Sequence, residues 1–256
     1  MAAPTPVHRL ITIPISHFCE KARWALERAG IAYREERHVQ GIHMLAAKRA
    51  GGGLTVPVLV TTSGEVLAES EQIIAFADRE LPEERRLIPS DPALRREVLE
   101  TSRWLDGGLG PEGRRLMYVR MLHLRTLMLE VNNQGVPAWE ARFLAATWPL
   151  STRAVKLRLG IGADAAEVSQ RRVEEAFDEI ARRLEAGGGY LCGGRFTAAD
   201  LTFAALSAAV VIPSEYGVTL PQPAVLPPDM AQLIDGFRAH PAGARALALF
   251  AEQRRA

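Results

Sequence analysis

Cysteine is scarce in this 256-residue chain: only Cys19 and Cys192 are present, and they form no CxxC pair. Two cysteines cannot build a disulfide framework, and no histidine and cysteine residues have the spacing of a metal site. These absences exclude a disulfide-rich secreted domain. We therefore expect a protein that holds no metal and works in the reducing environment of the cytoplasm.

Long hydrophobic runs and an excess of charge of one sign are also missing. The longest apolar stretch, residues 201–213, is too short to span a bilayer and is expected to form a buried helix. The first residues lack the pattern of a secretory signal. A formal net charge of +1 gives no bulk attraction to nucleic acid. The sequence thus predicts neither a membrane nor a nucleic acid as partner.

The first eighty or so residues alternate strand and helix patterns. Apolar and β-branched residues predict strands at 8–15, 31–39, 56–61 and 65–68, and helical spacing predicts helices at 20–29, 42–50 and 69–80. Gly30 ends the first helix, and Ser63-Gly64 forms the tight turn between the last two strands. The order is a βαβ unit followed by a helix, a hairpin and a final helix.

Beyond residue 92 the strand patterns cease. Helical patterns occupy residues 93–105, 114–131, 137–150, 165–185, 198–211 and 228–252, with breaks at glycine and proline. A charged segment that contains proline separates this part from the first. We therefore predict a small α/β domain at residues 1–82, a linker at 83–92 and a larger all-α domain at 93–256.

A Ser-His-Phe-Cys segment lies where the first strand turns into the first helix. Unpaired backbone N–H groups at a helix start stabilise an anion, either a carboxylate or a thiolate. Ser16 either caps this helix or donates a hydrogen bond to a bound thiolate. Cys19 is expected to pack on the inner side of the helix, where burial opposes thiolate formation. Ser16 is therefore the better candidate to contact the sulfur of a small thiol such as glutathione.

Two further dipeptides point to an extended, peptide-like ligand. Pro57 stands at the start of an expected central strand, a place that proline normally avoids. It is either an edge-strand proline or part of a cis Val56-Pro57 bond, which leaves the backbone of Val56 free to pair with a ligand. Glu69-Ser70 either caps the next helix or binds an amino-acid head group, with Ser70 on the carboxylate and Glu69 on the amino group.

Taken in order, the motifs at residues 16–23, 56–59 and 69–73 resemble the thioredoxin-like domain of the soluble glutathione transferases, in particular a serine-type, bacterial-like member. Residues 189–200 resemble the helical domain of the same family, with Thr197 and Asp200 as a capping box that starts a buried helix. The resemblance covers nearly the whole chain. It implies a thioredoxin-like N-terminal domain followed by an all-α helical domain, and a homodimer.

The resemblance also implies roles for individual residues. Ser16 would stabilise the thiolate of glutathione, which then attacks a small hydrophobic electrophile by alkyl or aryl transfer in detoxification. The residues expected to bind glutathione are Phe18, Val56, Pro57, Glu69, Ser70, His43 and Lys48. Of these, His43 and Lys48 would meet the glycine carboxylate, since Thr55 lacks the charge that often does so. Tyr118 and Trp139 are the candidates for the second-substrate pocket.

Two other functions stay open. In one, Cys19 is the redox thiol of a glutathione-dependent thiol transferase or reductase, although the first cysteine of that arrangement is missing. In the other, the chain is a non-catalytic scaffold with the transferase fold, because His17 stands where many members have proline and residues 51–55 depart from the usual approach to Pro57. The segment 110–162 matches no known pattern and leaves the electrophile undefined.

Overall fold

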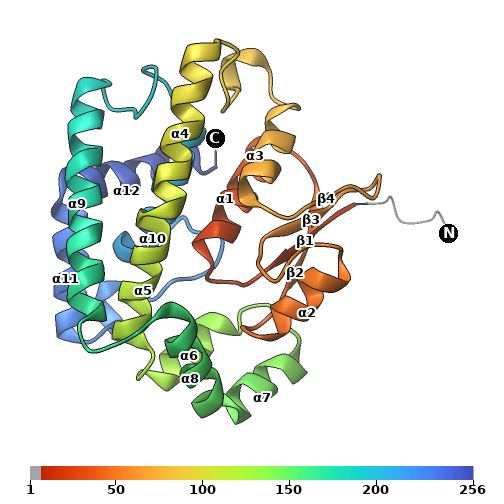
Figure 1. Ribbon diagram of the computed structural model, residues 1–256, viewed down its shortest axis with the longest axis vertical. Helices are drawn as coiled ribbons and strands as arrows, with labels where there is room; N and C mark the ends of the chain where they lie inside the picture. Colours follow the sequence, from red (N-terminus) through yellow and green to blue (C-terminus); the bar gives the residue numbers. More distant parts are fainter. Residues whose placement is uncertain (1–6, 256) are drawn as a thin grey trace.

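A four-stranded mixed sheet with helices on both of its faces forms the first part of the chain (Figure 1). The computed structural model describes residues 7–255, so residues 1–6 of the expected first domain lie outside the described part. The strand order is β2-β1-β3-β4, with β1 parallel to β2 and antiparallel to β3. The elements are β1 (His8–Thr12), α1 (His17–Arg28), β2 (Tyr33–Arg37), α2 (Ile42–Arg49), β3 (Val58–Val60), β4 (Val66–Leu67) and α3 (Ser70–Asp78).

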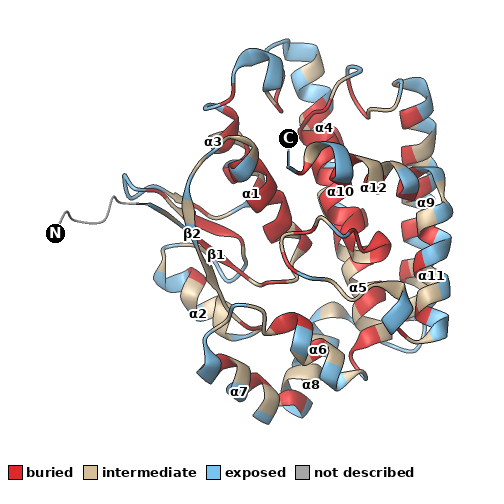
Figure 2. Ribbon diagram, turned by 180° about the vertical axis from the view of Figure 1, so that it is seen from behind, coloured by how far each residue is buried: buried red, intermediate tan, exposed pale blue. Residues whose placement is uncertain are grey.

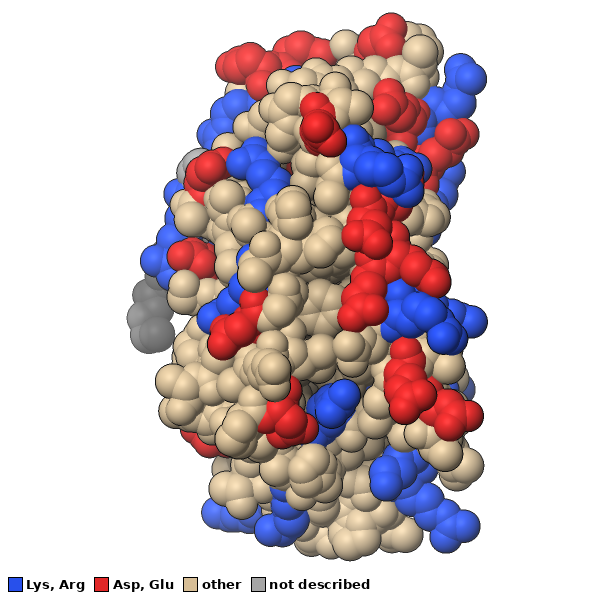
Figure 3. Space-filling model, turned by 90° about the vertical axis from the view of Figure 1, so that its left-hand side faces the viewer, with Lys and Arg blue, Asp and Glu red and all other residues tan. Residues whose placement is uncertain are grey.

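The predicted fold class is confirmed, because this is the thioredoxin-like arrangement and the described residues after it form helices and no strand. A short 3-10 turn, η1 (Glu83–Arg85), lies in the expected linker. The helices are α4 (Pro92–Gly107), α5 (Leu109–Met121), α6 (Arg125–Asn132), α7 (Ala138–Ala146), α8 (Trp148–Leu159), α9 (Ala165–Ala186), α10 (Ala198–Val211), α11 (Pro228–Ala239) and α12 (Pro241–Gln253), with the 3-10 turn η2 (Pro223–Val225) before α11. On the face formed by α9 and its neighbours, acidic and basic side chains are interspersed (Figure 3).

The prediction of three long helices is wrong, because the structure has two shorter helices in place of each. The expected helix at 114–131 is interrupted between α5 and α6, and 137–150 spans the junction of α7 with α8. The expected helix at 228–252 stops at His240, whose ring Nδ1 accepts a hydrogen bond from the N–H of Ala242 to cap α12. Pro149 and Pro241 lie in the first turns of α8 and α12. The N–H groups of a first turn have no partner within the helix, so proline loses no hydrogen bond there and favours the start of a new helix.

Helix α1 lies between the sheet and the helical part and is almost completely buried (Figure 2). It packs against α3 on one side and α10 on the other. Trp24 is fully buried; its ring lies 4.8 Å from that of Phe250, and its Nε1 donates to the carbonyl of Gln253 at 3.1 Å. The helix therefore joins the two parts of the molecule through one continuous core.

Buried charges on α1 are paired with residues far away in the chain. Lys21 is 1% exposed, and its Nζ lies 2.6 Å from Oδ1 of Asp106 in α4. Glu20 is fully buried and accepts from Nε of Arg254 at 2.7 Å, near the end of the chain. Because an unpaired charge in the interior is costly, each of these contacts requires both domains to be in place.

Helix α10, in which every residue except Ala209 is buried, begins with the predicted capping box, which the structure confirms. The carboxylate of Asp200 accepts from the backbone N–H of Thr197 and from its hydroxyl, both at 2.9 Å, and from the N–H of Leu191 at 2.8 Å. Burial raises the pKa of Asp200 to about 6. One carboxylate thus accepts hydrogen bonds from backbone N–H groups of the loop before the helix and of the helix start.

Asp200→Ala should lower the free energy of unfolding by about 3 kcal/mol, because it leaves buried donors without an acceptor. Urea denaturation followed by circular dichroism measures this. The matched control is Asp164→Ala at the start of α9, which is exposed and makes no side-chain cap. It should cost under about 0.5 kcal/mol, and equal losses in the two variants would contradict a structural role for the capping box.

Asp106→Asn should destabilise the protein by about 3 kcal/mol, because it leaves the buried Lys21 ammonium without its counter-ion. Arg103→Gln, also in α4, is the control: Arg103 and Glu71 form an exposed pair at 2.7 Å, and solvent screening should make its contribution to stability small. Chemical denaturation of both variants gives the comparison. A loss at Asp106 no larger than that at Arg103 would show that the Lys21 pair does not hold the domains together.

Candidate active site

The residues expected to bind a thiol peptide come together at one end of the sheet. Ile11 near the end of β1 pairs with Val58 at the start of β3 in antiparallel register. The chain that leaves β1 toward Ser16 therefore emerges beside the chain that enters β3 through Pro57. The Val56-Pro57 bond is cis.

The hairpin brings the third expected motif to the same end. Leu59 pairs with Leu67 in β4, so the chain leaving β4 runs back alongside the entry to β3 and reaches Glu69 and Ser70 there. Ser70 is buried, whereas Glu69 is exposed and does not cap α3 with its side chain. No ladder or turn hydrogen bond engages the backbone of Val56 within residues 7–255, so its N–H and C=O are available to an extended ligand.

Ser16 caps α1 and lies half-buried at its N-terminus. Its Oγ accepts from the N–H of Cys19 at 3.3 Å, which leaves the hydroxyl proton free to donate. Cys19 itself is fully buried, and burial raises the pKa of its thiol. The positive end of α1 and the Ser16 hydroxyl are thus exposed to a ligand, while the thiol is not.

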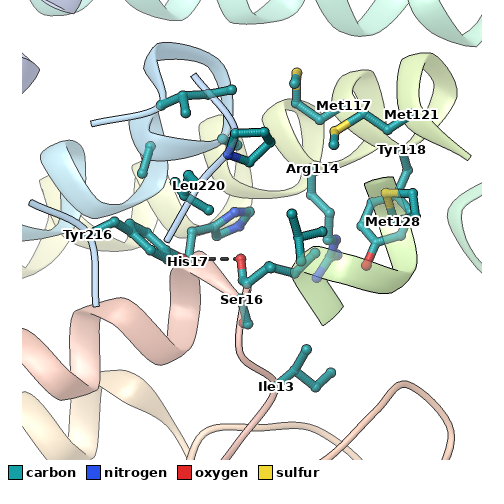
Figure 4. A pocket seen from close by; sticks show the side chains of 16 residues that line it. Ile13, Ser16, His17, Arg114, Met117, Tyr118, Met121, Met128, Tyr216 and Leu220 are labelled. Carbon is teal, nitrogen blue, oxygen red and sulfur yellow. Dashed lines mark hydrogen bonds between the residues drawn. The ribbon is translucent and has the colours of Figure 1, made fainter. Parts of the chain in front are cut away.

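Ser16 opens onto a cavity of about 140 Å³ between the two domains (Figure 4). Its walls come from the segment between β1 and α1, from the first residue of α1, from α5, α6 and α10, and from the segment after α10. Most of the lining side chains are apolar; they include Ile13, Met117, Met121, Met128, Val131 and Ile212. Methionine side chains adapt to varied shapes, so this wall suits a small apolar molecule.

Two polar side chains interrupt the apolar wall. His17 is buried, its Nε2 has no hydrogen-bond partner, and burial, with help from the nearby Arg114 and Lys21 charges, lowers its pKa to about 3. Arg114 in α5 extends toward the same space (Figure 4). The sequence reasoning missed both as site residues. Arg114 stands four positions before Tyr118, and that spacing on one helical face was the available signal.

The two residues expected in the second-substrate pocket lie in different places. Tyr118 lines the cavity, and its hydroxyl accepts from Nε2 of Gln40 at 2.9 Å; burial raises its pKa. Trp139 lies on α7, is 59% exposed and does not line this cavity. Its neighbour on the same face, Phe143, is also exposed.

The remaining residues expected to contact glutathione are Phe18, His43 and Lys48. Phe18 packs between the domains, with its ring close to Gly110, where a Cβ atom would lie only 2.7 Å from the ring. His43 accepts from the N–H of Gly41, and burial lowers its pKa to about 4, so it is neutral at pH 7 and cannot act as a cation there. Lys48 is exposed on α2 and keeps its charge available.

Two known family profiles match the sequence, one in the α/β part and one in the helical part. "Glutathione S-transferase, N-terminal domain" matches residues 10–85, and "Glutathione S-transferase, C-terminal domain" matches residues 163–220, so together they cover just over half of the chain. The chain belongs to the glutathione S-transferase superfamily. Residues 86–162 lie outside both matches, and they include Arg114 and Tyr118.

Solved structures of glutathione S-transferases share the fold over nearly the whole chain. One from Methylobacillus flagellatus with glutathione bound has 16% identity and a TM-score of 0.59, covering 94% of this chain and 93% of that one. One from Ceriporiopsis subvermispora in complex with glutathione has 19% identity and a TM-score of 0.63, covering 97% and 98%. One from Xanthobacter autotrophicus has 21% identity and a TM-score of 0.56, covering 96% and 93%. No protein of curated function matches the sequence.

Two further statements hold for residues 7–255, the part of the chain that the structure describes. No helix there is long and apolar enough to cross a lipid bilayer. No three histidine, cysteine, aspartate or glutamate side chains gather there in a way that would hold a metal ion. The polar side chains that line the cavity are those of Ser16, His17, Arg114, Tyr118 and Tyr216.

His17→Gln should make the protein less sensitive to acid. The folded chain holds the pKa of His17 at about 3, whereas an unfolded histidine has a pKa of about 6.5, so only the unfolded state takes up this proton between those values. The stability that comes from keeping His17 neutral is fully present above pH 6.5 and is lost as the pH falls from about 6.5 toward 3. Between about pH 7 and pH 4.5, the variant should lose about 2 kcal/mol less unfolding free energy than the wild type.

Urea denaturation at the two pH values measures this difference. His123→Gln, which removes an exposed histidine at the end of α5, is the control for a general effect of losing one imidazole. If the wild type and His17→Gln lose the same stability between the two pH values, His17 is not held neutral in the folded protein.

Proposed function

We propose that this protein is a serine-type glutathione transferase that activates the thiol of glutathione for attack on a small hydrophobic electrophile. The observation that carries the proposal is the position of Ser16, which caps α1 at the sheet end and also lines the apolar cavity. A helix N-terminus and a hydroxyl donor both favour a thiolate over a thiol. The same side chain thus faces the thiol and the electrophile.

Glutathione would bind in an extended form along the sheet end. We infer that the backbone of Val56, which precedes the cis Pro57, pairs with the cysteinyl part. Ser70 and the start of α3 would hold the γ-glutamyl carboxylate, and Glu69 the amino group. Phe18 and Pro57 would border the cysteinyl part. Lys48 is the cation available for the glycine carboxylate, and His43 would contribute a neutral hydrogen bond.

The reaction follows from this arrangement. The thiol of glutathione releases its proton to solvent, and the Ser16 hydroxyl donates a hydrogen bond to the thiolate that remains. The thiolate then attacks the electrophilic carbon of the second substrate in the cavity. A sulfur–carbon bond forms while the bond to the leaving group breaks, and the leaving group departs with the electron pair. The lowered thiol pKa and the proximity of the two reactants supply the acceleration.

Membership of the superfamily supports the remaining proposals, which are a homodimer, a cytoplasmic location and a role in detoxification. The burial of Cys19 and its raised pKa argue against the alternative in which Cys19 is the redox thiol. The scaffold alternative predicts no turnover and weak glutathione binding, so the experiment below separates it from the transferase.

Ser16→Ala should raise the pKa of enzyme-bound glutathione by about one to two pH units, because the thiolate loses a charge-assisted hydrogen bond. The affinity for glutathione should stay within several-fold. Calorimetry gives the affinity, and ultraviolet absorbance of the thiolate against pH gives the pKa in the same preparation. Turnover of 4-chloro-3-nitrobenzoate, an aryl chloride that carries a carboxylate, reports the transfer reaction.

Two further variants serve as controls. Cys19→Ala should cost some stability and little activity, and abolished turnover would favour the thiol-transferase function instead. Glu69→Ala should weaken glutathione binding without changing the pKa of the bound thiol, since it removes only the partner of the amino group. An unchanged pKa of the bound thiol in Ser16→Ala would show that Ser16 takes no part in the mechanism. A wild type that does not bind glutathione at millimolar concentration would favour the non-catalytic scaffold.

A further inference from the structure

Arg114 is a cation in an apolar wall: its guanidinium carbon lies 5.9 Å from the centroid of the Phe18 ring, and no described residue places an anion beside it. Its side chain is half-buried in α5, its Nε is buried without a hydrogen-bond partner, and no acidic residue within 7–255 forms an ion pair with it. The other two arginines of α5 do not line the cavity, and both form ion pairs. Arg115 pairs with Glu112 at 2.8 Å and Arg120 with Asp229 at 3.5 Å. The Nε of Arg120 is also buried without a hydrogen-bond partner, so the feature particular to Arg114 in α5 is that it faces the cavity and makes no ion pair.

Other donors at the cavity lack an acceptor as well. The buried Nε2 of the neutral His17 has no partner, and it is a donor in the tautomer that carries the ring proton on Nε2. The hydroxyl of Tyr118 accepts from Gln40, which leaves its own proton free to donate. Figure 4 shows these side chains around the same space as Arg114. Charged and polar groups in such surroundings are stable only when an acceptor meets them, so the cavity is complementary to a ligand that brings negative charge.

The apolar part of the cavity limits the size of that ligand. Its volume is about 140 Å³, close to the roughly 150 Å³ of an engineered apolar cavity that binds benzene. A ligand with an apolar body near the size of one ring fits the methionine-rich part, and a carboxylate attached to it reaches the guanidinium. Arginine binds carboxylates through paired N–H groups, which fixes the orientation of the ligand as well as its charge.

We propose that Arg114 is the anion-binding residue of the second-substrate pocket, and that the electrophiles this protein accepts carry a carboxylate on an apolar body about the size of one aromatic ring. The inference rests on the proposed function for the reaction itself. Its physical core, a carboxylate on Arg114, concerns binding alone and is measured without glutathione.

The test compares two ligands of nearly identical shape, cinnamate and its neutral amide cinnamamide, in calorimetric titrations without glutathione. The wild type should bind cinnamate at least about tenfold more tightly than cinnamamide, since a hydrogen bond to a charged group is worth that much. Arg114→Met should lose at least about tenfold in affinity for cinnamate and keep its affinity for cinnamamide within about twofold. Retained cinnamamide binding also shows that the variant folds.

Arg120→Met is the matched control, because Arg120 lies on the same helix but outside this cavity. It should change neither affinity by more than about twofold. Equal affinities for the two ligands in the wild type, no binding of either ligand, or an unchanged cinnamate affinity in Arg114→Met would each overturn the proposal.

A second measurement identifies which anion Arg114 serves. If Arg114→Met raises the pKa of bound glutathione as Ser16→Ala does and leaves the preference for cinnamate intact, the guanidinium pairs with the thiolate and the proposal is wrong. A carboxylate preference that depends on Arg114 in a protein that does not bind glutathione would uphold the anion site and overturn the transferase. A protein that activates glutathione but shows no preference for the carboxylate would uphold the transferase and overturn the anion site.

Discussion

The burial of α1 with its charged side chains is the constraint on which the rest of the structure depends. A helix that carries Glu20, Lys21 and Arg23 cannot enter the interior unless each charge meets a partner there. Lys21 finds Asp106 in α4, and Glu20 finds Arg254 at the end of the chain. The domains are thus fixed to each other through one helix whose stability requires both of them.

This constraint also positions the candidate site, because Ser16 is the cap of that same helix. The segment after α10 is attached to the start of α1 as well: Tyr216 donates from its hydroxyl to the carbonyl of Ile15 at 3.1 Å, and the N–H of Gly217 donates to Glu20 at 3.2 Å. One wall of the cavity is therefore tied to the residue that would contact the thiol. The geometry between thiol and electrophile follows from packing around α1 and does not depend on an exposed loop.

The two parts of the site differ in how closely they follow the superfamily. The sheet end with its cis proline and helix start belongs to the segment that the N-terminal family profile matches. Arg114 and Tyr118 belong to the unmatched segment between the two profiles. The solved structures share the fold at 16–21% identity, so they carry no information on what this cavity takes. The chemistry of the second substrate is therefore a property of this chain's own residues.

Local signals in the sequence determined the fold class, the caps at Ser16 and Thr197 and the order of the strands, because caps, turns and periodicity act between residues close in the chain. They also indicated that Cys19 would be buried. Periodicity did not reveal that proline begins α8 and α12 within runs of helix formers. Only the tertiary structure brought Arg114 and His17 to one cavity and left the Nε of Arg114 and the Nε2 of His17 without hydrogen-bond partners. Contacts across about a hundred residues depend on how whole helices pack, and no short-range pattern records that.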